Sequence, residues 1–372
     1  MRYQRVCLES FGYVLPDEIV TSAEIEARLA PLYGRLRLPE GRLELMTGIR
    51  ERRFWAPGTL PSEISIQSAE RAIAAAEIDK ADIGCLIHAS VCRNHLEPAT
   101  ACRVHHGLGL SEDCVIYDAS NACLGLLNGM LQVANMIELG QIRAGVVVGT
   151  ESSRPLVENT IARLNGDTSL TREQMKLAVA SLTIGSASAA VVLVDRDLSR
   201  TQNRFRAAVA RANTQFHALC HSGGDESIAG GMQPWMTTDS ERLLHAGVAT
   251  AKEAFSGFLR EFDRDEDEIN KIFCHQVGVA HRRLLFESLR LRPEADFSTV
   301  EFLGNTGSVA APVTAAIGIE QGHLSEGDQV AMLGIGSGLN VIMLGVDWQT
   351  SPARAGAGVD EQMSVLGHES ER

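Results

Sequence analysis

The segment DASNACLG, at residues 118–125, decides the fold, because its cysteine stands where a short apolar strand gives way to a helix. We predict the strand over residues 115–118 and the helix over residues 124–139. The helix is apolar on almost every side and is followed by Gly140, a residue type that commonly ends helices. Such a helix must be covered all round, so the sequence predicts a buried helix with Cys123 at its start.

The elements around this cysteine occur a second time. Residues 82–150 and 268–338 share one order: a strand, a loop, a short strand, a buried helix, a turn with glycine and another strand. Cys123 and Asn305 each lie 17 residues before the glycine that follows the buried helix. The expected elements of the second copy are strands at Lys271–Cys274, 301–302 and 330–334 and a helix at 309–320. The spacing between the two copies is too long for a solenoid repeat, so we predict two similar halves packed as one globular unit.

The strands of the first half are continuous apolar runs separated by helices. The expected elements are a helix at 62–78 and strands at 86–90, 115–118, 144–149 and Ala187–Asp195. Runs of this kind predict a buried, mostly parallel sheet with helices on both faces. An early helix should start at the capping box TSAE, residues 21–24.

The composition shifts at two places along the chain. We place an N-terminal half at residues 1–197 and a C-terminal half at residues 198–349, with the charged segment 195–204 as the seam. Residues 350–372 have little apolar content and no period, so we predict a disordered tail.

Charge and composition exclude several classes of partner. The 372 residues carry a net charge of −13, which argues against a nucleic-acid backbone or an anionic membrane surface as the main partner. The apolar runs are far shorter than a membrane span requires, and the first 20 residues lack a signal-peptide core. The eight cysteines are scattered without a CxxC pair, which indicates neither a disulfide framework nor a zinc site. We therefore expect a cytoplasmic protein.

Cys123 is the one cysteine at the start of a buried helix. The positive end of a helix dipole lowers the pKa of a thiol, and the free N–H groups there can hold an oxyanion. The sequence alone also allows a buried structural cysteine at this position.

Two further side chains follow strands of the second half. His275 comes directly after the strand Lys271–Cys274, at the sheet edge where ligands gather in α/β proteins. Asn305 lies in the turn LGNTGS, at the place equivalent to Cys123. Taken singly, a structural histidine and a turn asparagine would be ordinary. The glycine-rich segment GIGSGLN, at residues 334–340, lacks the lysine of a P-loop, so a tight turn near the nucleophile is the better interpretation.

The motifs NACLG, CHQ and LGNTG within two repeated halves resemble the thiolase superfamily, and TGIRERRF at residues 47–54 and IGSASAAVVLV at residues 184–194 resemble its ketoacyl synthase III branch. The resemblance spans about residues 3–348. It implies a five-layered αβαβα fold with a mixed sheet in each half. It also implies that Cys123 is acylated by a thioester, while His275 and Asn305 act on the second substrate.

Two features separate the chain from the fatty-acid starter enzymes of that branch. Those enzymes carry a Trp and an Arg that clamp the adenine of coenzyme A, whereas residues 42–46 here read RLELM. The segments RNHLEP at residues 93–98 and LGIGSGLN at residues 333–340 are instead similar to the OleA thiolases of long-chain olefin synthesis. That resemblance implies the head-to-head condensation of two long-chain acyl-CoA molecules to a β-keto acid, without decarboxylation.

A malonyl thioester forms its carbanion by losing CO₂, but a simple acyl-CoA has no carboxyl group to lose. It must lose an α-proton instead, and this requires a positioned base. Glu97 is the candidate, and the resemblance implies that it reaches the site from the other subunit of a homodimer. The expected catalytic residues are therefore Cys123, His275, Asn305, Glu97 and Ser337. Ser337 would act through its backbone N–H, which would hold the thioester oxyanion together with the N–H of Cys123. We expect no metal and no cofactor besides the coenzyme A of the substrate.

Two alternatives remain open at this stage. One is a decarboxylative 3-oxoacyl synthase that uses a malonyl thioester. The other is a non-catalytic partner subunit, although such a subunit would have no reason to keep Cys123, His275 and Asn305 together. The sequence does not determine the length or branching of the acyl chain, the pathway and its final product, or the segments that line the acyl tunnels. It also leaves open whether the partner subunit is a second copy of this chain or a related chain.

Overall fold

A computed structural model describes residues 1–222 and 234–351. Most of the predicted tail, residues 352–372, lies outside the described residues. The strands are β1 (Val6–Val14), β2 (Glu18–Thr21), β3 (Glu51–Phe54), β4 (Ile83–Ala89), β5 (Val115–Ala119), β6 (Ala144–Glu151), β7 (Ala187–Asp195), β8 (Arg204–Ala212), β9 (Cys220–Ser222), β10 (Met236–Thr238), β11 (Lys271–Cys274), β12 (Gln329–Gly336) and β13 (Asn340–Asp347).

The helices vary widely in length. They are α1 (Ser22–Arg28), α2 (Ala30–Leu36), α3 (Arg42–Thr47), α4 (Pro61–Ala76), α5 (Thr100–Leu108), α6 (Gly125–Glu138), α7 (Arg154–Gly166), α8 (Arg172–Ala178), α10 (Ser240–Phe262), α11 (Val279–Leu289), α12 (Val300–Leu303) and α13 (Ala310–Glu320). No helix in residues 1–222 or 234–351 is long and apolar enough to cross a membrane.

Each half contributes a mixed sheet. In the first, the strand order is β5-β4-β6-β7-β1, and in the second it is β8-β13-β12-β11. The strands β4, β5 and β6 run parallel, as do β11 and β12, while the pairs that involve β7 or β13 are antiparallel. The two sheets meet where Cys7 of β1 pairs with Arg204 of β8, so nine strands follow one another in a continuous order.

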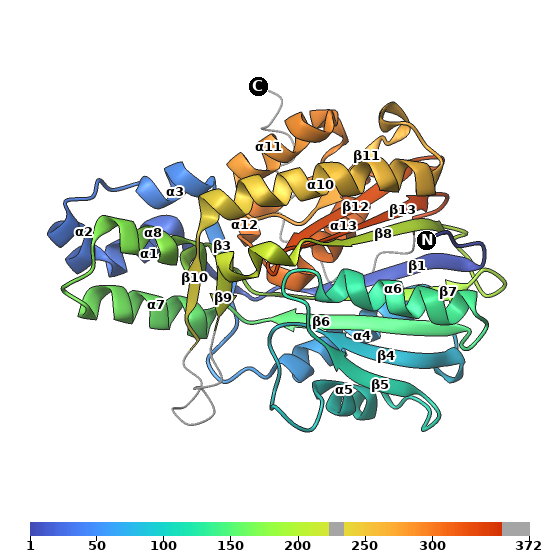
Figure 1. Cartoon of the computed structure of the whole chain (residues 1–372). Coiled ribbons are helices and arrows are strands. Elements are labelled where there is room, and N and C mark those ends of the chain that lie inside the picture. The colour runs from blue at the N-terminus through green and yellow to red at the C-terminus, as the bar shows by residue number, and fades with distance from the viewer. Residues whose placement is uncertain (223–233, 352–372) are drawn as a thin grey trace.

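Helices cover these sheets in five layers, as the resemblance implied. Helices α4 and α5 pack on the outer face of the first sheet, and α10 packs on the outer face of the second. Between the sheets lie α6 and α13, each of which contacts strands of both halves. Figure 1 shows α10 and α11 at the top of the molecule and α5 at the bottom, with the strands between them.

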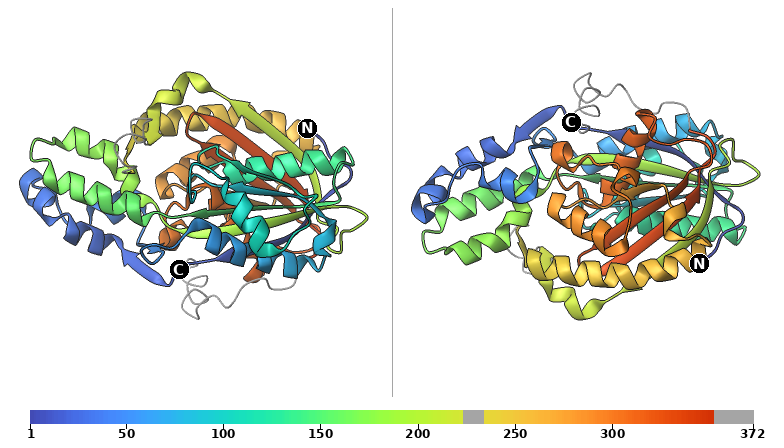
Figure 2. Two further views of the ribbon diagram at one scale, coloured as in Figure 1. Left: turned by 90° about the horizontal axis from the view of Figure 1, so that it is seen from below. Right: turned by 90° about the horizontal axis from the view of Figure 1, so that it is seen from above.

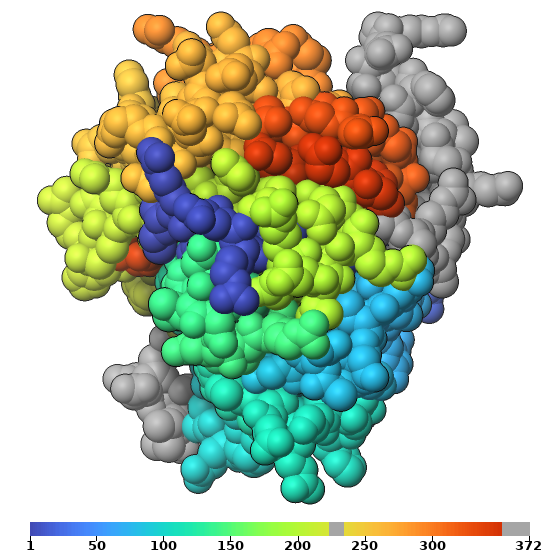
Figure 3. Space-filling model, turned by 90° about the vertical axis from the view of Figure 1, so that its right-hand side faces the viewer, coloured from blue at the N-terminus to red at the C-terminus, as the bar shows by residue number. Residues whose placement is uncertain are grey.

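The chain's first residues join the two halves. The amino group of Met1 donates to the carbonyl of Ala208 in β8 over 3.0 Å. The N–H of Gln4 donates to the carboxylate of Glu138 at the end of α6, also over 3.0 Å. Figure 3 shows these N-terminal residues on the surface between the two halves. The segment therefore fastens the second sheet to the central layer.

A group of helices extends beyond the sheets at one end of the molecule. It consists of α1, α2, α3, α7 and α8, and both views of Figure 2 show it as a lobe separate from the layered body. The lobe has its own apolar core, in which Ile25, Leu32 and Val157 are fully buried. The predicted capping box is confirmed at its first helix, because Thr21 accepts from the N–H of Glu24 and the Glu24 carboxylate accepts from the N–H of Thr21.

Two details of the sequence prediction are wrong. The apolar runs predicted mostly parallel sheets, but the sheets are mixed, as the resemblance implied, because antiparallel strands such as β7 are covered on both faces and so also form continuous apolar runs. The short strand expected at residues 301–302 belongs to α12. The strand that corresponds to β5 is reduced to one parallel bridge between Ile272 and Asp296.

Candidate active site

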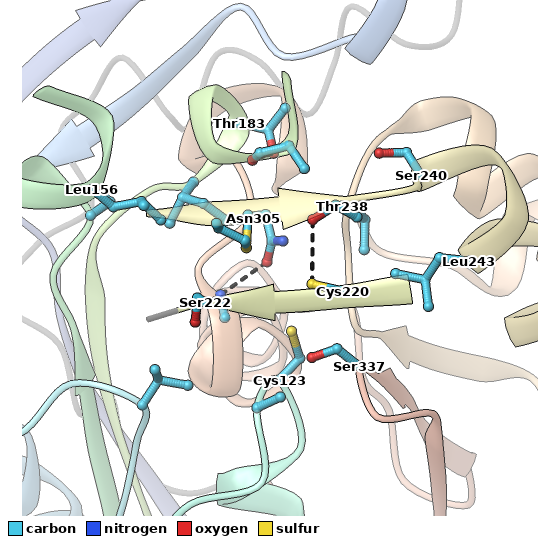
Figure 4. A pocket seen from close by; sticks show the side chains of 18 of the residues that line it. Cys123, Leu156, Thr183, Cys220, Ser222, Thr238, Ser240, Leu243, Asn305 and Ser337 are labelled. Atoms are coloured by element: carbon cyan, nitrogen blue, oxygen red, sulfur yellow. Dashed lines mark hydrogen bonds between the residues drawn. The ribbon is translucent and has the colours of Figure 1, made fainter. Parts of the chain in front are cut away.

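A cavity of about 1160 Å³ lies where the two halves and the helical lobe meet (Figure 4). Cys123, His275, Asn305 and Ser337 all line it, although they come from four separate segments of the chain. Much of the remaining lining is apolar, and the segment after β6 supplies a large share, namely Pro155, Leu156, Leu177, Val179, Ala180 and Ile184. The cavity is larger than the usual 300–1,000 Å³ of small-molecule sites.

Cys123 sits in a tight turn between β5 and α6. The preceding residue, Ala122, has φ of 45°, a left-handed conformation that costs a non-glycine residue about 1–3 kcal/mol. The turn is held from outside, because Asn121 accepts a hydrogen bond from Asn340 and donates one to Asn128. This fixed turn aims the thiol into the cavity.

The glycine-rich segment packs directly against this turn. It forms the end of β12 and the hairpin into β13. A Cβ atom on Gly336 would lie only 2.8 Å from Leu124 and 3.7 Å from the Cys123 nitrogen, so glycine is needed for the close approach. The tight turn near the nucleophile is therefore confirmed. Figure 4 shows the Ser337 side chain beside the Cys123 thiol, with Cys220 facing that thiol from β9.

The turn with Asn305 is anchored through its backbone. Its N–H donates to the Thr183 carbonyl, and its own carbonyl accepts from Gly185, each over 2.9 Å. The side-chain oxygen of Asn305 accepts from the N–H of Gly307 over 3.0 Å. This bond fixes the orientation of the amide, whose NH₂ group can donate to a ligand in the cavity.

Two imidazoles line the cavity from the second half. The backbone of His275 is held by β12, where its N–H donates to the Leu333 carbonyl over 2.8 Å. Burial, with a smaller contribution from the nearby His281, lowers the pKa of His275 to about 3. Burial likewise lowers the pKa of His281 to about 4. Both rings are therefore neutral near pH 7, and each can donate from one nitrogen and accept at the other.

The pKa of the Cys123 thiol differs from the one predicted from the sequence. Burial raises this pKa to about 12, with smaller contributions from the neighbouring Cys220 and Glu151. The expected lowering of this pKa at the start of α6 is wrong, because loss of solvation disfavours the thiolate in this mainly apolar cavity. The thiol is protonated in the empty protein, so its attack on a substrate requires a proton acceptor.

Glu97 is not brought to the cavity within one chain. Its side chain is exposed in the loop after β4, whereas the preceding Leu96 and Arg93 do line the cavity. The described residues thus bring together four of the five predicted site residues, and the fifth lies close by in sequence but outside the lining.

Sequence reasoning did not assign Glu151, Cys220 or His281 to the site, although all three line the cavity. Glu151 ends the apolar strand β6, so the rule that singled out His275 after β11 applies to it equally. His281 follows His275 by six residues, within the first turn of α11. Cys220 lies in a polar segment that gives no such signal. No group of three potential metal ligands gathers within the described parts of the chain.

Comparison of the sequence with those of known proteins shows which family the chain belongs to. The chain is 44% identical over 351 residues to the acyl-CoA:acyl-CoA alkyltransferase of Shewanella oneidensis, covering 94% of this chain and 100% of that one. It belongs to the acyl-CoA:acyl-CoA alkyltransferase family. A second member, from Xanthomonas campestris, is 33% identical over 348 residues, with 94% and 100% coverage.

Solved structures agree with this family assignment. Xanthomonas campestris OleA with bound cerulenin has a TM-score of 0.88 and 33% identity, covering 94% of this chain and 98% of that chain. A cysteine-to-serine variant of the same protein, with bound lauric acid and lauroyl-CoA, has a TM-score of 0.87 and 32% identity, covering 93% and 100%. Residues 259–348 also match the 3-oxoacyl-[acyl-carrier-protein] synthase III C-terminal family. These alkyltransferases are thus acyltransferases of the thiolase superfamily.

The raised thiol pKa predicts how Cys123 responds to alkylation. Without substrate, its rate of reaction with iodoacetamide should rise about tenfold per pH unit between about pH 7 and about pH 10, because the thiolate fraction rises that way below the pKa. Peptide mass spectrometry separates Cys123 from the other seven cysteines. Glutathione is the control for an ordinary thiol. A plateau below about pH 8 would instead support the lowered pKa expected from the sequence.

Proposed function

We propose that the protein condenses two long-chain acyl-CoA molecules head to head, without loss of CO₂, through an acyl group on Cys123. The observation that carries this proposal is the meeting of Cys123, His275 and Asn305 in one large, mainly apolar cavity. The names of the relatives support it, since both are acyl-CoA:acyl-CoA alkyltransferases. The bound lauroyl-CoA of the related OleA structure supports the same class of substrate.

In the first half-reaction, the Cys123 sulfur attacks the thioester carbonyl of one acyl-CoA. The thiol proton passes by way of neutral His275 to the departing coenzyme A thiolate, so coenzyme A leaves as a free thiol. The N–H groups of Cys123 and Ser337 stabilise the oxyanion of the intermediate, an interaction whose loss typically costs about 10²–10³ in rate. The apolar lining accepts the acyl chain.

In the second half-reaction, Glu97 removes the α-proton of a second acyl-CoA. The side chains of His275 and Asn305 hold the enolate oxygen, and the enolate carbon attacks the acyl-Cys123 carbonyl. The Cys123–acyl bond breaks, the thiolate takes up the proton removed earlier, and a 2-alkyl-3-ketoacyl-CoA forms. Hydrolysis of its thioester yields the β-keto acid.

We propose a homodimer in which each subunit supplies Glu97 to its partner's cavity. Three observations support this arrangement: Glu97 is exposed, it follows the lining residue Leu96, and it lies near the sheet edge formed by β5. Apolar side chains are exposed both in this loop and on the edge strand: Val91 and Leu96 of the loop are 45% and 59% exposed, and Val115 at the other end of β5 is 47% exposed. Apolar side chains at an unpaired edge are typical of a subunit contact.

The proposal extends to cytoplasmic location, a role in lipid or olefin synthesis together with further pathway enzymes, and no cofactor besides the coenzyme A of the substrate. The division into halves at residues 1–197 and 198–349 remains a proposal of the same kind. A malonyl-dependent synthase and a non-catalytic subunit are less favoured, because neither matches the relatives' names.

Myristoyl-CoA offered as the only substrate tests this function. The protein should gain one myristoyl mass on Cys123 and release a condensed 2-alkyl-3-keto product, since it needs no malonyl donor. Cys123→Ala should show neither, and the matched control Cys102→Ala, outside the cavity lining, should show both. Product formation that requires malonyl-CoA would establish the decarboxylative alternative, and absence of both loading and product would support a non-catalytic subunit.

The proposed base predicts a separate defect for Glu97→Gln. This variant should load Cys123 at a near-normal rate and then condense about 10²–10⁴-fold more slowly, because a carboxamide cannot take the α-proton. Product release from myristoyl-CoA measures the second step, and intact mass measures the first.

Mixing the two inactive variants tests the origin of the base. Glu97→Gln combined with Cys123→Ala should regain activity after subunit exchange, because a mixed dimer holds one complete site. Normal turnover by Glu97→Gln alone would place the base elsewhere, and no recovery in a verified mixed dimer would place Glu97 in its own subunit's site.

A further inference from the structure

Glu151 is a buried carboxylate in the cavity that the proposed reaction does not use. Glu151 is the last residue of β6, it is only 5% exposed, and it lines the same cavity as Cys123. A buried carboxylate is costly unless hydrogen bonds satisfy it. Its partners are therefore informative about what it holds in place.

One set of partners belongs to the turn that carries Asn305. The hydroxyl of Ser308 donates to Glu151 Oε1 over 2.5 Å, and the Ser308 N–H approaches the same oxygen at 3.3 Å. Gly307 packs on the side chain, since a Cβ atom there would lie 3.2 Å from Glu151 Cγ. The turn after Asn305 thus rests on this carboxylate, although turn and carboxylate come from different halves of the chain.

The other set of partners belongs to the loop that leads to Glu97. The N–H of Val91 donates to Glu151 Oε1 over 3.1 Å, and the N–H of Cys92 donates to Oε2 over 3.3 Å. These residues lie near the start of the loop after β4. The same loop contains Glu97, six residues after Val91 and five after Cys92. The same carboxylate therefore holds the Asn305 turn of its own cavity and the start of the loop that, in the proposed dimer, carries Glu97 to the partner's cavity.

The charge of Glu151 also reaches the nucleophile. Its donors are the Ser308 hydroxyl, three backbone amides and the Cys92 thiol. All of them are neutral, so they hold the carboxylate without cancelling its charge. After burial and Cys220, Glu151 is the next cause of the raised pKa of Cys123. The other titratable side chains that share the cavity with the thiol include Cys220 of β9 and the two imidazoles His275 and His281.

We propose that Glu151 is a positioning residue, whose carboxylate anchors both the turn that carries Asn305 and the start of the loop that carries Glu97. The same carboxylate also brings a negative charge into the cavity that holds the Cys123 thiol. The inference rests on the proposed function for its effect on condensation. Its effect on the thiol requires no substrate. The two parts can therefore be measured separately.

Two substitutions separate the charge from the anchoring. Glu151→Gln keeps the shape but removes the charge and turns an NH₂ group toward backbone donors. Ser308→Ala removes one hydroxyl donor and leaves the charge. Glu63→Gln is the matched control, because Glu63 is an exposed carboxylate paired with Arg103 on the far side of α4. Circular dichroism and thermal melting establish that each variant is folded.

The first readout is alkylation of Cys123 by iodoacetamide without acyl-CoA. Glu151→Gln should react about three- to tenfold faster at every pH below the thiol pKa, because removal of a nearby negative charge stabilises the thiolate. Ser308→Ala and Glu63→Gln should react at the wild-type rate. A purely structural role would not shift this profile, so an unchanged rate in folded Glu151→Gln would overturn the charge part of the proposal.

The second readout compares acyl loading with condensation of myristoyl-CoA. Glu151→Gln and Ser308→Ala should load Cys123 within about twofold of wild type and condense at least about tenfold more slowly, since misplacing Asn305 and Glu97 harms only the second step. Wild-type condensation in both variants, or an equal loss of loading and condensation, would overturn the positioning part. If wild type itself makes no product, the proposed function fails, while the alkylation result still decides the effect on the thiol. Should Glu151→Gln not fold, Ser308→Ala decides the anchoring alone.

Discussion

The fold depends on two largely buried helices that lie between the two sheets. Helix α13 is buried from Ala310 to Gly318, and α6 is buried along most of its length apart from a narrow polar stripe of Asn128, Gln132 and Asn135. Helices of this kind are stable in water only when apolar surface covers them on all sides, which here means one sheet on each side. Their N-termini then lie close to one cavity. The turns that carry Cys123 and Asn305 precede these two helices, so the same burial that stabilises the fold brings the nucleophile and the amide together.

That burial also sets the chemistry of the site. The enclosed cavity keeps His275 neutral and Cys123 protonated, so the resting protein holds a thiol and an imidazole rather than a thiolate and an imidazolium. A neutral imidazole can pass a proton and can also donate to an enolate oxygen. A protonated thiol is protected from unwanted alkylation and oxidation until a substrate enters. The low polarity of the site is therefore part of its mechanism as well as of its stability.

Much of this arrangement could be predicted from the sequence, because apolar periodicity and internal repetition are local signals. The repeat related Cys123 to Asn305, and several strand ends were correct to within a few residues, with β7 and β11 correct at both ends. Strand direction was not predictable, since a strand covered on both faces has the same composition in either direction. The strand expected at residues 301–302 failed because four residues that form a helical turn satisfy the same short apolar pattern.

The remaining features of the site depend on contacts between distant segments. No local pattern indicates that Glu151 binds the turn after Asn305, or that a lobe built from α1–α3 and α7–α8 closes one end of the cavity. The pKa of Cys123 likewise depends on the burial that the whole fold imposes. Helix position alone therefore predicted the wrong direction.

The central claim is that two acyl-CoA molecules have distinct fates in one cavity, the first as an acyl group on Cys123 and the second as an enolate. A chain-order experiment tests it most directly. The protein is loaded with myristoyl-CoA, freed of excess substrate and then given lauroyl-CoA for a single turnover. The account predicts a product whose keto side carries the myristoyl chain and whose α-branch comes from lauroyl-CoA. A product with the chains reversed, or an equal mixture of both orders, would contradict it.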